Sequence, residues 1–306
     1  MPPLAVVVTT HTDRHLLRVL RGVGSQTRQP DAVVVTCDTA DNAIAAVVEQ
    51  AARELGRELV LVQREFCGTA RSGQVRNNGA RALLRMGMGD RSRVVFLDGD
   101  CCPAGDALAW HERLGRPRMG RRGGKRGRLV VGFRIDLTPD QTEAFDDAAL
   151  GRGVAPVLVT NEQREPLRLR HKRYRWQARL RRLGIGKEHK PKVLSANFSV
   201  TLADFVRLNG FDESYEGYGQ EDDDFGRRAY AIGVRPAVGV ARAIVYHQWH
   251  PTRAPGEWRA SRNAPRLEQE APVRCVLGLD NPMPQPDPVI LHVPPDRPRR
   301  PMLSIA

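Results

Sequence analysis

The sequence contains no long run of apolar residues free of charges, so it predicts no helix that could span a membrane. It also predicts no signal peptide. Met1-Pro2-Pro3 leads directly into a strand-like segment, without a basic region, a long apolar stretch and a small-residue cleavage site. These absences favour a cytoplasmic protein.

Cysteine is rare as well, with five residues in a chain of 306. The number is odd and the spacing shows no zinc-site pattern, which fits reduced thiols and a cytoplasmic location. None lies in an obvious setting for a nucleophile, so we expect structural thiols. The cysteines are Cys37, Cys67, Cys101, Cys102 and Cys275.

Regular periodicity is missing after Pro251, where 12 of the 22 prolines lie in the last 56 residues. Such a composition predicts an extended wrapping segment or disorder rather than a second folded domain.

Strand and helix signals alternate through the N-terminal half, which predicts a mostly parallel sheet with helices on both faces. A chain of this length can bury its core in one large domain or in two tightly joined halves. The predicted strands are Leu4–Thr9, Ala32–Thr36, Leu59–Val62, Val94–Leu97, Leu129–Ile135 and Val193–Val200. The predicted helices are one capped by Thr12 or Asp13 and ending near Gly24, residues 43–55, one entered through Gly68–Gly73 and ending at Arg85, Lys172–Leu183, and one capped by Thr201 and ending at Leu208.

The positive charge is concentrated in two segments. The net charge of the chain is +13, while residues 113–128 contribute +8 and residues 164–192 contribute +10. Residues 115–128 also hold five glycines, which predicts a mobile loop. Local basic segments favour a polyanionic partner, such as nucleic acid, an anionic membrane surface, an acidic peptide or a nucleotide diphosphate. The alternative is a pair of solvated surfaces without a partner.

The predicted strand Val94–Leu97 ends in Asp98-Gly99-Asp100, two carboxylates separated by one residue. Side chains at the carboxyl end of a buried parallel strand lie where such sheets bind ligands. Two carboxylates at this spacing can face one divalent cation, which can in turn hold a diphosphate. The same spacing also occurs in ordinary turns, so the motif alone decides nothing.

Four consecutive acids, Glu221 to Asp224, follow a glycine-rich turn. They would repel each other unless they open a helix, where the macrodipole favours acids, or face a cation or a hydrogen-bonding ligand. Phe225, Ala229, Tyr230 and Ile232 have helical spacing, so we expect a helix that begins at these acids beside a cleft.

Five segments in this order, covering about residues 4 to 250, together resemble a known family. The chain resembles metal-dependent, inverting nucleotide-sugar glycosyltransferases of the glycosyltransferase-A (GT-A) fold, family 2 type. Its C-terminal half resembles β-1,4-galactosyltransferases and polypeptide N-acetylgalactosaminyltransferases. The matching segments are Val6-Val7-Val8-Thr9-Thr10-His11, Val33-Val34-Val35-Thr36-Cys37-Asp38, Arg76-Asn77-Asn78-Gly79-Ala80-Arg81, Asp98-Gly99-Asp100, and Gly210-Phe211-Asp212-Glu213 with Glu221-Asp222-Asp223-Asp224.

The resemblance implies an α/β GT-A catalytic domain over residues 1–250. It comprises a nucleotide-binding half with a Rossmann-like sheet at 1–112 and a smaller acceptor-side half at 113–250. A proline-rich tail at 251–306 follows.

The resemblance also implies a metal site. Asp100 is the first choice as a ligand, His247 the second and Asp98 a further one, while His250 would bond phosphate. An imidazole together with a carboxylate favours Mn²⁺ over Mg²⁺.

For catalysis the resemblance points to Asp222 as the general base, with Glu221 beside it bonding sugar hydroxyls. Asp223 and Asp224 are interpreted as residues that shape the start of the helix. Nucleotide contacts are expected at the ends of the first strands. These candidates are Thr9, Thr10, His11, Asp38, Arg76 and Asp98.

The implied function is transfer of a hexose or N-acetylhexosamine from a UDP-sugar to a hydroxyl of a glycan, protein or small molecule, with inversion in one displacement. The alternatives are the same chemistry on a polyanionic acceptor (modified DNA or an acidic protein), or a non-catalytic nucleic-acid-binding protein on a transferase scaffold. Gly217-Tyr218-Gly219 stands where galactosyltransferases often carry Gly-Trp-Gly. The donor therefore stays open among UDP-galactose, UDP-N-acetylgalactosamine, UDP-N-acetylglucosamine and UDP-glucose, the first two being favoured.

Overall fold

The computed structural model describes residues 2–119, 125–217, 219–251, 263–268, 272–296 and 300–301. The centre of the predicted basic loop and Tyr218 of the glycine-rich turn lie outside the described residues, as does part of the predicted tail. Among the described residues, no helix is long and apolar enough to cross a membrane.

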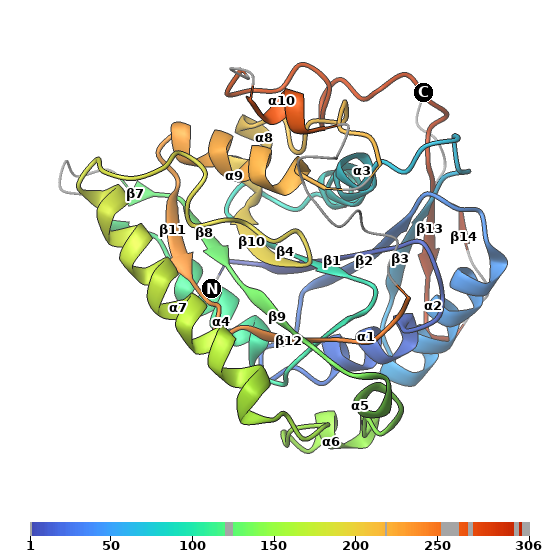
Figure 1. Ribbon diagram of the computed structural model, residues 1–306. Helices are drawn as coiled ribbons and strands as arrows, with labels where there is room; N and C mark the ends of the chain where they lie inside the picture. Colours follow the sequence, from blue (N-terminus) through green and yellow to red (C-terminus); the bar gives the residue numbers. More distant parts are fainter. Residues whose placement is uncertain are drawn as a thin grey trace.

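A nine-stranded sheet forms the centre of the molecule (Figure 1). Its four central strands run parallel in the order β4-β1-β2-β3. Among the described residues of the sheet, only β10 and β13 run antiparallel to β1. The predicted mostly parallel α/β sheet is confirmed. In sheet order the strands are β11 (Arg235–Val238), β8 (Arg128–Val131), β10 (Asn197–Thr201), β4 (Arg93–Asp98), β1 (Leu4–Thr10), β2 (Ala32–Cys37), β3 (Leu59–Gln63), β13 (Val289–Val293) and β14 (Arg300–Pro301).

Helices cover both faces of this sheet, so the valine-rich central strands are buried on both sides. In Figure 1, α3, α8 and α9 lie above the sheet, and α1, α2 and α4 lie below it. The helices are α1 (Leu16–Gly24), α2 (Asn42–Leu55), α3 (Ser72–Arg85), α4 (Ala107–Gly115), α5 (Pro139–Glu143), α6 (Asp147–Gly151), α7 (Asn161–Arg182), α8 (Leu202–Arg207), α9 (Glu221–Ala231) and α10 (Ala264–Glu268).

A second sheet of three short strands delivers late parts of the chain to the end of β4. β5 (Cys101–Pro103) follows the carboxylate motif directly, and β12 (Ile244–His247) pairs with it antiparallel. β9 (Phe133–Asp136) pairs parallel with the other edge of β12, so His247 lies opposite both Cys101 and Asp136. A short hairpin of β6 (Arg118–Met119) and β7 (Lys125–Arg126) borders the basic loop.

Several predicted boundaries were wrong. The first helix begins at Leu16 after His15, which provides no side-chain cap, so neither Thr12 nor Asp13 caps it. The strand predicted at 129–135 is divided at Gly132 into β8 and β9, which enter different sheets. The strand predicted from Val193 begins only at Asn197, and the basic helix predicted from Lys172 begins eleven residues earlier, at Asn161 with Thr160 as its cap.

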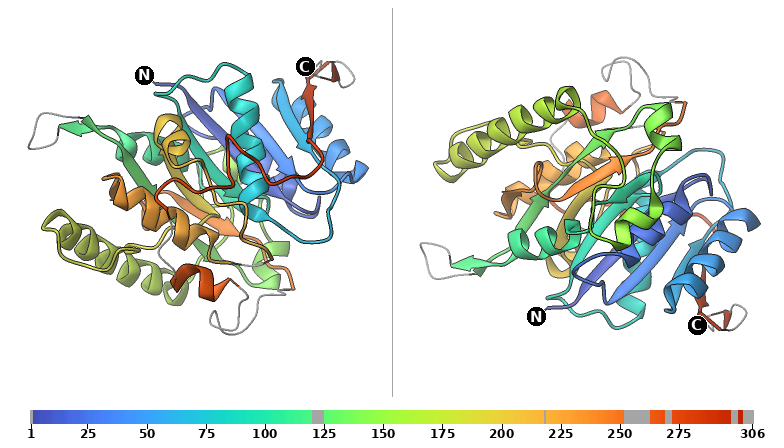
Figure 2. Two further views of the ribbon diagram at one scale, coloured as in Figure 1. Left: turned by 90° about the horizontal axis from the view of Figure 1, so that it is seen from above. Right: turned by 90° about the horizontal axis from the view of Figure 1, so that it is seen from below.

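The described part of the C-terminal segment wraps around the N-terminal half. β13 extends the central sheet by pairing antiparallel with β3. In the left view of Figure 2 the red segment before it crosses over α3, where Arg81 donates a hydrogen bond to the backbone oxygen of Leu279 at 2.8 Å. The sequence predicted either an extended wrapping segment or disorder after Pro251, and the described residues of this part form a wrapping segment. The domain boundary at residue 250 stays a prediction.

Candidate functional site

Three potential metal ligands meet at the carboxyl end of β4. Asp100 Oδ2 lies 3.1 Å from His250 Nε2 and 3.6 Å from His247 Nε2. One ligand atom from each residue lies within 4.8 Å of the other two, so the three could hold one ion. One carboxylate and two imidazoles are a donor set that suits a borderline divalent cation. The resemblance implies a phosphate contact for His250, which stays a prediction; in the structure His250 lies within the group of potential metal ligands.

Asp136 orients His247 from the far edge of β12. His247 Nδ1 lies 2.9 Å from Asp136 Oδ1, which also accepts a bond from Arg134 Nε at 2.9 Å. Burial by itself lowers the pKa of His247, but its bonds to Asp100 and Asp136 outweigh burial and raise the pKa to about 9. A carboxylate on the outer nitrogen of a ligand imidazole fixes the ring orientation and increases its basicity.

Arg18 and Gln248 hold the loop that carries both histidines. The backbone N–H of Gln248 donates to the backbone oxygen of Asp100 at 2.8 Å, and its buried side chain accepts a bond from Arg18 Nη1 at 2.7 Å. Arg18 Nε also pairs with Asp147 at 2.7 Å. The register between the carboxylate motif and the His247 loop is therefore set by side chains from α1 and α6.

Arg76 joins the carboxylate motif to the acidic block. Its guanidinium lies 2.5 Å from Asp98 Oδ1 and 3.4 Å from Glu221 Oε1, and the side chain is only 3% exposed. Burial lowers the pKa of Arg76, but the charges of Asp98 and Glu221 more than offset this, so the guanidinium stays protonated. Asp98 was predicted as a metal ligand. In the structure it forms an ion pair with Arg76 and is not in the three-residue group with Asp100, so its role as a metal ligand stays a prediction.

Asp222 opens α9 beside Glu221 in an environment that resists a negative charge. Burial, followed by the charges of Glu221 and Asp223, raises the pKa of Asp222 to about 7. Its carboxylate accepts a long bond of 3.4 Å from the backbone N–H of Ser195. A carboxyl group tuned to neutral pH beside a charged cluster is a candidate general base.

The last two acids of the block have structural partners. Asp223 pairs with Lys192, and Asp224 pairs with Arg228 at 2.7 Å, with both side chains of the second pair fully buried. These contacts agree with the interpretation that Asp223 and Asp224 shape the helix start.

The predicted nucleotide contacts lie at the carboxyl ends of β1 and β2. Thr9 pairs in register with Asp98 on one side and Thr36 on the other. Its hydroxyl oxygen is buried and forms no hydrogen bond within the described residues. Asp38 directly follows β2 and is nearly buried, while His11 is exposed. Thr10 instead uses its hydroxyl to bond the backbone of Thr12.

The glycine of the carboxylate motif is required by close packing. A Cβ on Gly99 would lie 2.6 Å from Thr10 Cβ. Only glycine lets the chain turn here between its two carboxylates without displacing the end of β1.

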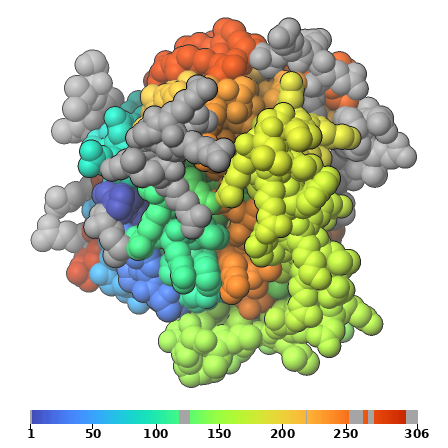
Figure 3. All heavy atoms as spheres, turned by 90° about the vertical axis from the view of Figure 1, so that its left-hand side faces the viewer, coloured from blue at the N-terminus to red at the C-terminus, as the bar shows by residue number. Residues whose placement is uncertain are grey.

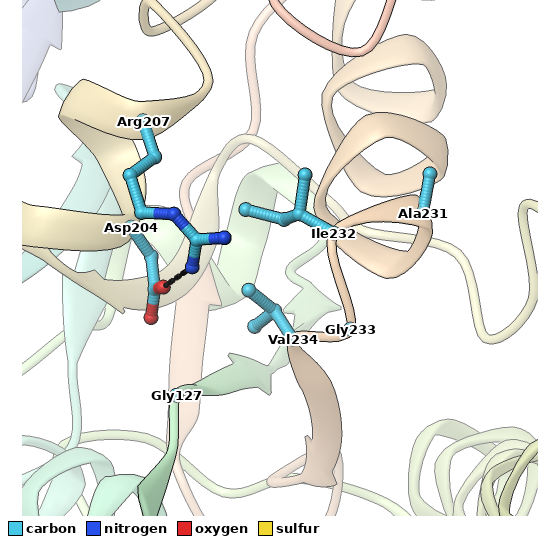
Figure 4. A pocket seen from close by; sticks show the side chains of 7 residues that line it. All are labelled: Gly127, Asp204, Arg207, Ala231, Ile232, Gly233 and Val234. Carbon is cyan, nitrogen blue, oxygen red and sulfur yellow. Dashed lines mark hydrogen bonds and ion pairs between the residues drawn. The ribbon is translucent and has the colours of Figure 1, made fainter.

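One cavity is remote from these residues. It measures about 440 Å³ and lies among the start of β8, the start of β11, α8 and the end of α9 (Figure 4). In its wall Arg207 and Asp204 pair with each other at 3.3 Å. Because β8 and β11 begin here, the cavity lies at the opposite end of the sheet from Asp98 and Asp100, and we assign it no part in the site.

Sequence reasoning missed Asp136, Arg18 and Gln248. Asp136 carried a weak signal, since it is an acid one residue beyond a predicted strand end. Arg18 and Gln248 carried none, because their roles depend on contacts between segments more than 100 residues apart.

Two family models match the chain. One described as glycosyltransferase like family 2 matches residues 2–128, and one described as N-terminal domain of galactosyltransferase matches residues 185–248. No curated protein matches the chain in sequence.

Among solved structures, GalNAc-T7 with UDP, GalNAc and Mn²⁺ is 16% identical at a TM-score of 0.56, covering 87% of this chain and 47% of that one. The structure of S. aureus TarS is 16% identical at a TM-score of 0.47, and the match covers 81% of this chain and 37% of the TarS chain. The catalytic domain of Drosophila beta1,4galactosyltransferase 7 in complex with xylobiose is 13% identical at a TM-score of 0.47, and the match covers 91% of this chain and 84% of that one. The chain thus spans less than half the length of the GalNAc-T7 and TarS chains.

The family 2-like match contains Asp98 and Asp100, and the galactosyltransferase match contains Asp222 and His247. The chain thus has the GT-A fold that it shares with GalNAc-T7, and it is similar to family 2-like glycosyltransferases in its N-terminal part and to galactosyltransferases in its C-terminal part.

Proposed function

We propose that the protein transfers a hexose or N-acetylhexosamine from a UDP-sugar to an acceptor hydroxyl by a single, inverting displacement that depends on a divalent cation. The observation that carries the proposal is the meeting of two clusters at the end of β4. Asp100, His247 and His250 form the first. Arg76 ties Asp98 to Glu221, next to Asp222, in the second.

The donor atoms support a bound cation. Asp100, His247 and His250 would hold it, and Asp136 would keep the His247 ring in place. When bound, the cation would neutralise charge on the leaving diphosphate. Mn²⁺ is our choice over Mg²⁺ because two of the three donors are imidazoles, and because the similar GalNAc-T7 structure holds UDP and Mn²⁺.

Asp222 would act as the base. Its carboxylate accepts the proton of the acceptor hydroxyl while that oxygen bonds to the anomeric carbon of the sugar. The bond between this carbon and the diphosphate breaks on the opposite side, and the diphosphate leaves with the electron pair. One displacement inverts the anomeric centre. A pKa raised to about 7 lets Asp222 take up the proton near neutral pH.

The remaining predicted residues would bind and orient the donor. Thr9, Thr10, His11 and Asp38 lie where parallel sheets bind nucleotides. Arg76 is already neutralised by Asp98 and Glu221, so we assign it the positioning of these two acids rather than direct phosphate binding.

The acceptor stays open among a glycan, a protein and a small molecule, with modified DNA or an acidic protein as the polyanionic alternatives. Part of the basic segment 113–128 lies outside the described residues. The similarity of both parts of the chain to glycosyltransferase family models weighs against a non-catalytic nucleic-acid-binding protein.

The deciding experiment measures UDP release from a panel of UDP-sugars with Mn²⁺, with Mg²⁺ and with EDTA. Turnover should collapse in EDTA and recover best with Mn²⁺. Asp100→Ala should reproduce the effect of the chelator, whereas Asp287→Ala, which removes an exposed acid far along the chain, should not. Full turnover in EDTA would show that this enzyme works without a cation.

A further inference from the structure

Helix α7 carries a row of exposed apolar side chains. It is 22 residues long, yet only Leu167, Tyr174 and Ala178 of its described side chains are buried. Leu169, Trp176 and Leu183 are 56%, 59% and 72% exposed. Residues seven apart lie two helical turns apart on one face, so these side chains form a row along α7 and its C-cap.

We call Leu169, Trp176, Leu183 and the exposed Ile185 the apolar stripe. Leu167, Tyr174 and Ala178 bury the other face of α7, which packs beside β9 and β11. Both views of Figure 2 place α7 at an edge of the molecule, and Figure 3 shows it as a yellow-green ridge. The stripe therefore faces away from the core and leaves large apolar side chains in water, which is unusual unless something binds there.

Basic side chains flank the stripe. Lys172, Arg173, Arg175, Arg179 and Arg182 are exposed, and none forms an ion pair with a residue that the structure describes. Between residues 166 and 187 the chain has no acid at all. Two other arginines of α7 are occupied: Arg170 stacks over the ring of Phe133 and Arg181 over that of Tyr230.

An anionic bilayer surface fits both features together. A helix that lies in the plane of a membrane presents Trp and Leu toward the acyl region and Lys and Arg toward the headgroups. Each basic side chain near an anionic surface adds attraction. Nucleic acid would account for the cations but would leave the four apolar side chains unexplained.

We propose that α7 is a peripheral membrane-docking surface, with the apolar stripe entering the headgroup region of a bilayer rich in anionic lipid. This inference goes beyond the proposed function and does not depend on it. It also requires no membrane-spanning helix, in agreement with the described helices.

Co-sedimentation of the full chain with lipid vesicles tests the proposal. One vesicle set contains phosphatidylcholine alone, and the other contains phosphatidylcholine and phosphatidylglycerol in equal parts. The stripe variant is Leu169→Gln/Trp176→Gln/Leu183→Gln, and the charge variant is Lys172→Gln/Arg173→Gln/Arg179→Gln. The matched controls replace exposed residues elsewhere, namely Leu84→Gln/Val273→Gln/Val276→Gln and Arg53→Gln/Arg85→Gln/Arg91→Gln.

The wild type and both controls should bind the anionic vesicles and not the neutral ones. The charge variant should bind about 100-fold more weakly, and the stripe variant at least about tenfold more weakly. Thermal unfolding and donor hydrolysis should be unchanged, because all six side chains lie on the surface.

Two results would overturn the proposal. The first is a wild-type chain that does not bind anionic vesicles. The second is a stripe variant that binds them as well as wild type. Suppose that the stripe variant binds anionic vesicles as well as wild type and that the charge variant loses affinity for a labelled DNA duplex. The surface would then be a general polyanion-binding site and not a membrane-docking one.

Discussion

Asp222 is the residue whose chemistry depends most on its surroundings. If it takes the acceptor proton, Asp222→Asn should lower turnover by a factor of ~10³ while UDP affinity stays within a few-fold of wild type, since a base acts on the acceptor and not on the nucleotide. Steady-state kinetics with UDP titration checks this. Loss of UDP binding equal to the loss of turnover would place Asp222 in the donor site instead.

The raised pKa of Asp222 predicts a pH dependence. Because burial and the charges of Glu221 and Asp223 raise its pKa to about 7, the base is protonated and inactive in acid. Turnover at saturating substrates should therefore rise about tenfold per pH unit toward pH 7 and level off above it. The residual activity of Asp222→Asn should not show this rise of turnover with pH. If turnover of both proteins rose with pH over the same range, the titrating group would be another residue.

The same pKa fixes the sign of a stability effect. An aspartate in the unfolded chain has a pKa of ~3.9, so the folded state binds the proton of Asp222 more tightly than the unfolded state does. The free energy of unfolding then falls as pH rises from about 4 to about 7. In urea at pH 8, Asp222→Asn should be more stable than wild type by roughly 1 kcal/mol or more, and equal to it near pH 4. A less stable variant at pH 8 would contradict the shift.

Asp136 illustrates a residue that acts through another. Asp136→Asn should weaken Mn²⁺ binding by about 10- to 100-fold, since the His247 ring loses a charged partner on its outer nitrogen. Isothermal titration of the protein with Mn²⁺ measures this directly, without activity. Asp140→Asn, which changes an exposed acid in α5, is the matched control. Equal affinities for the two variants would show that Asp136 has no part in the site.

At the scale of elements, the docking of α3 on the sheet depends on Gly79. A Cβ there would lie 2.5 Å from Val7 Cγ1, the end of a stiff side chain on buried β1. Alanine is favoured over glycine inside helices by ~1 kcal/mol, but forcing α3 away from β1 costs ~1–3 kcal/mol. Gly79→Ala should therefore destabilise the protein in urea unfolding and lower turnover by displacing Arg76. Gly89→Ala, where a Cβ meets nothing, should do neither.

At the scale of the whole molecule, Glu213 joins three distant parts of the chain. Its fully buried carboxylate pairs with Arg81 at 2.6 Å and accepts bonds from Asn77 Nδ2 at 2.9 Å and from the backbone N–H of Met283 at 2.8 Å. Removing one partner of a buried ion pair leaves the other charge unpaired, at a cost of ~3–5 kcal/mol. Glu213→Ala should lower the free energy of unfolding by about that amount.

Glu58→Ala is the control for this change, because Glu58 also joins the C-terminal segment to the sheet, through His292 at 2.8 Å, but on the surface. An exposed pair is worth ~0–1 kcal/mol. Equal effects of the two substitutions, measured by urea unfolding, would mean that burial of Glu213 contributes nothing.

The sequence alone determined where the central strands lie along the chain and that polar side chains gather at their carboxyl ends. Val6–Val8, Val33–Val35 and Val94–Leu97 are apolar runs that only a sheet buried on both faces can satisfy. The polar residues after each run then had to gather at one edge, because parallel strands share a direction. For the same reason Asp100 could be selected as a candidate before the fold was known, whereas the acids at the start of α9 were selected because four consecutive acids follow a glycine-rich turn.

Only the tertiary structure decided which of these candidates meet. Asp98 pairs with Arg76 rather than joining Asp100, His250 lies with His247 and Asp100, and Asp136 supports His247. A sequence pattern reports the surroundings of neighbouring residues, whereas each of these contacts joins segments 22 to more than 100 residues apart. Which carboxylate faces a cation and which faces a guanidinium depends on distances of a few ångströms, and those are set by the packing of the two sheets and α3.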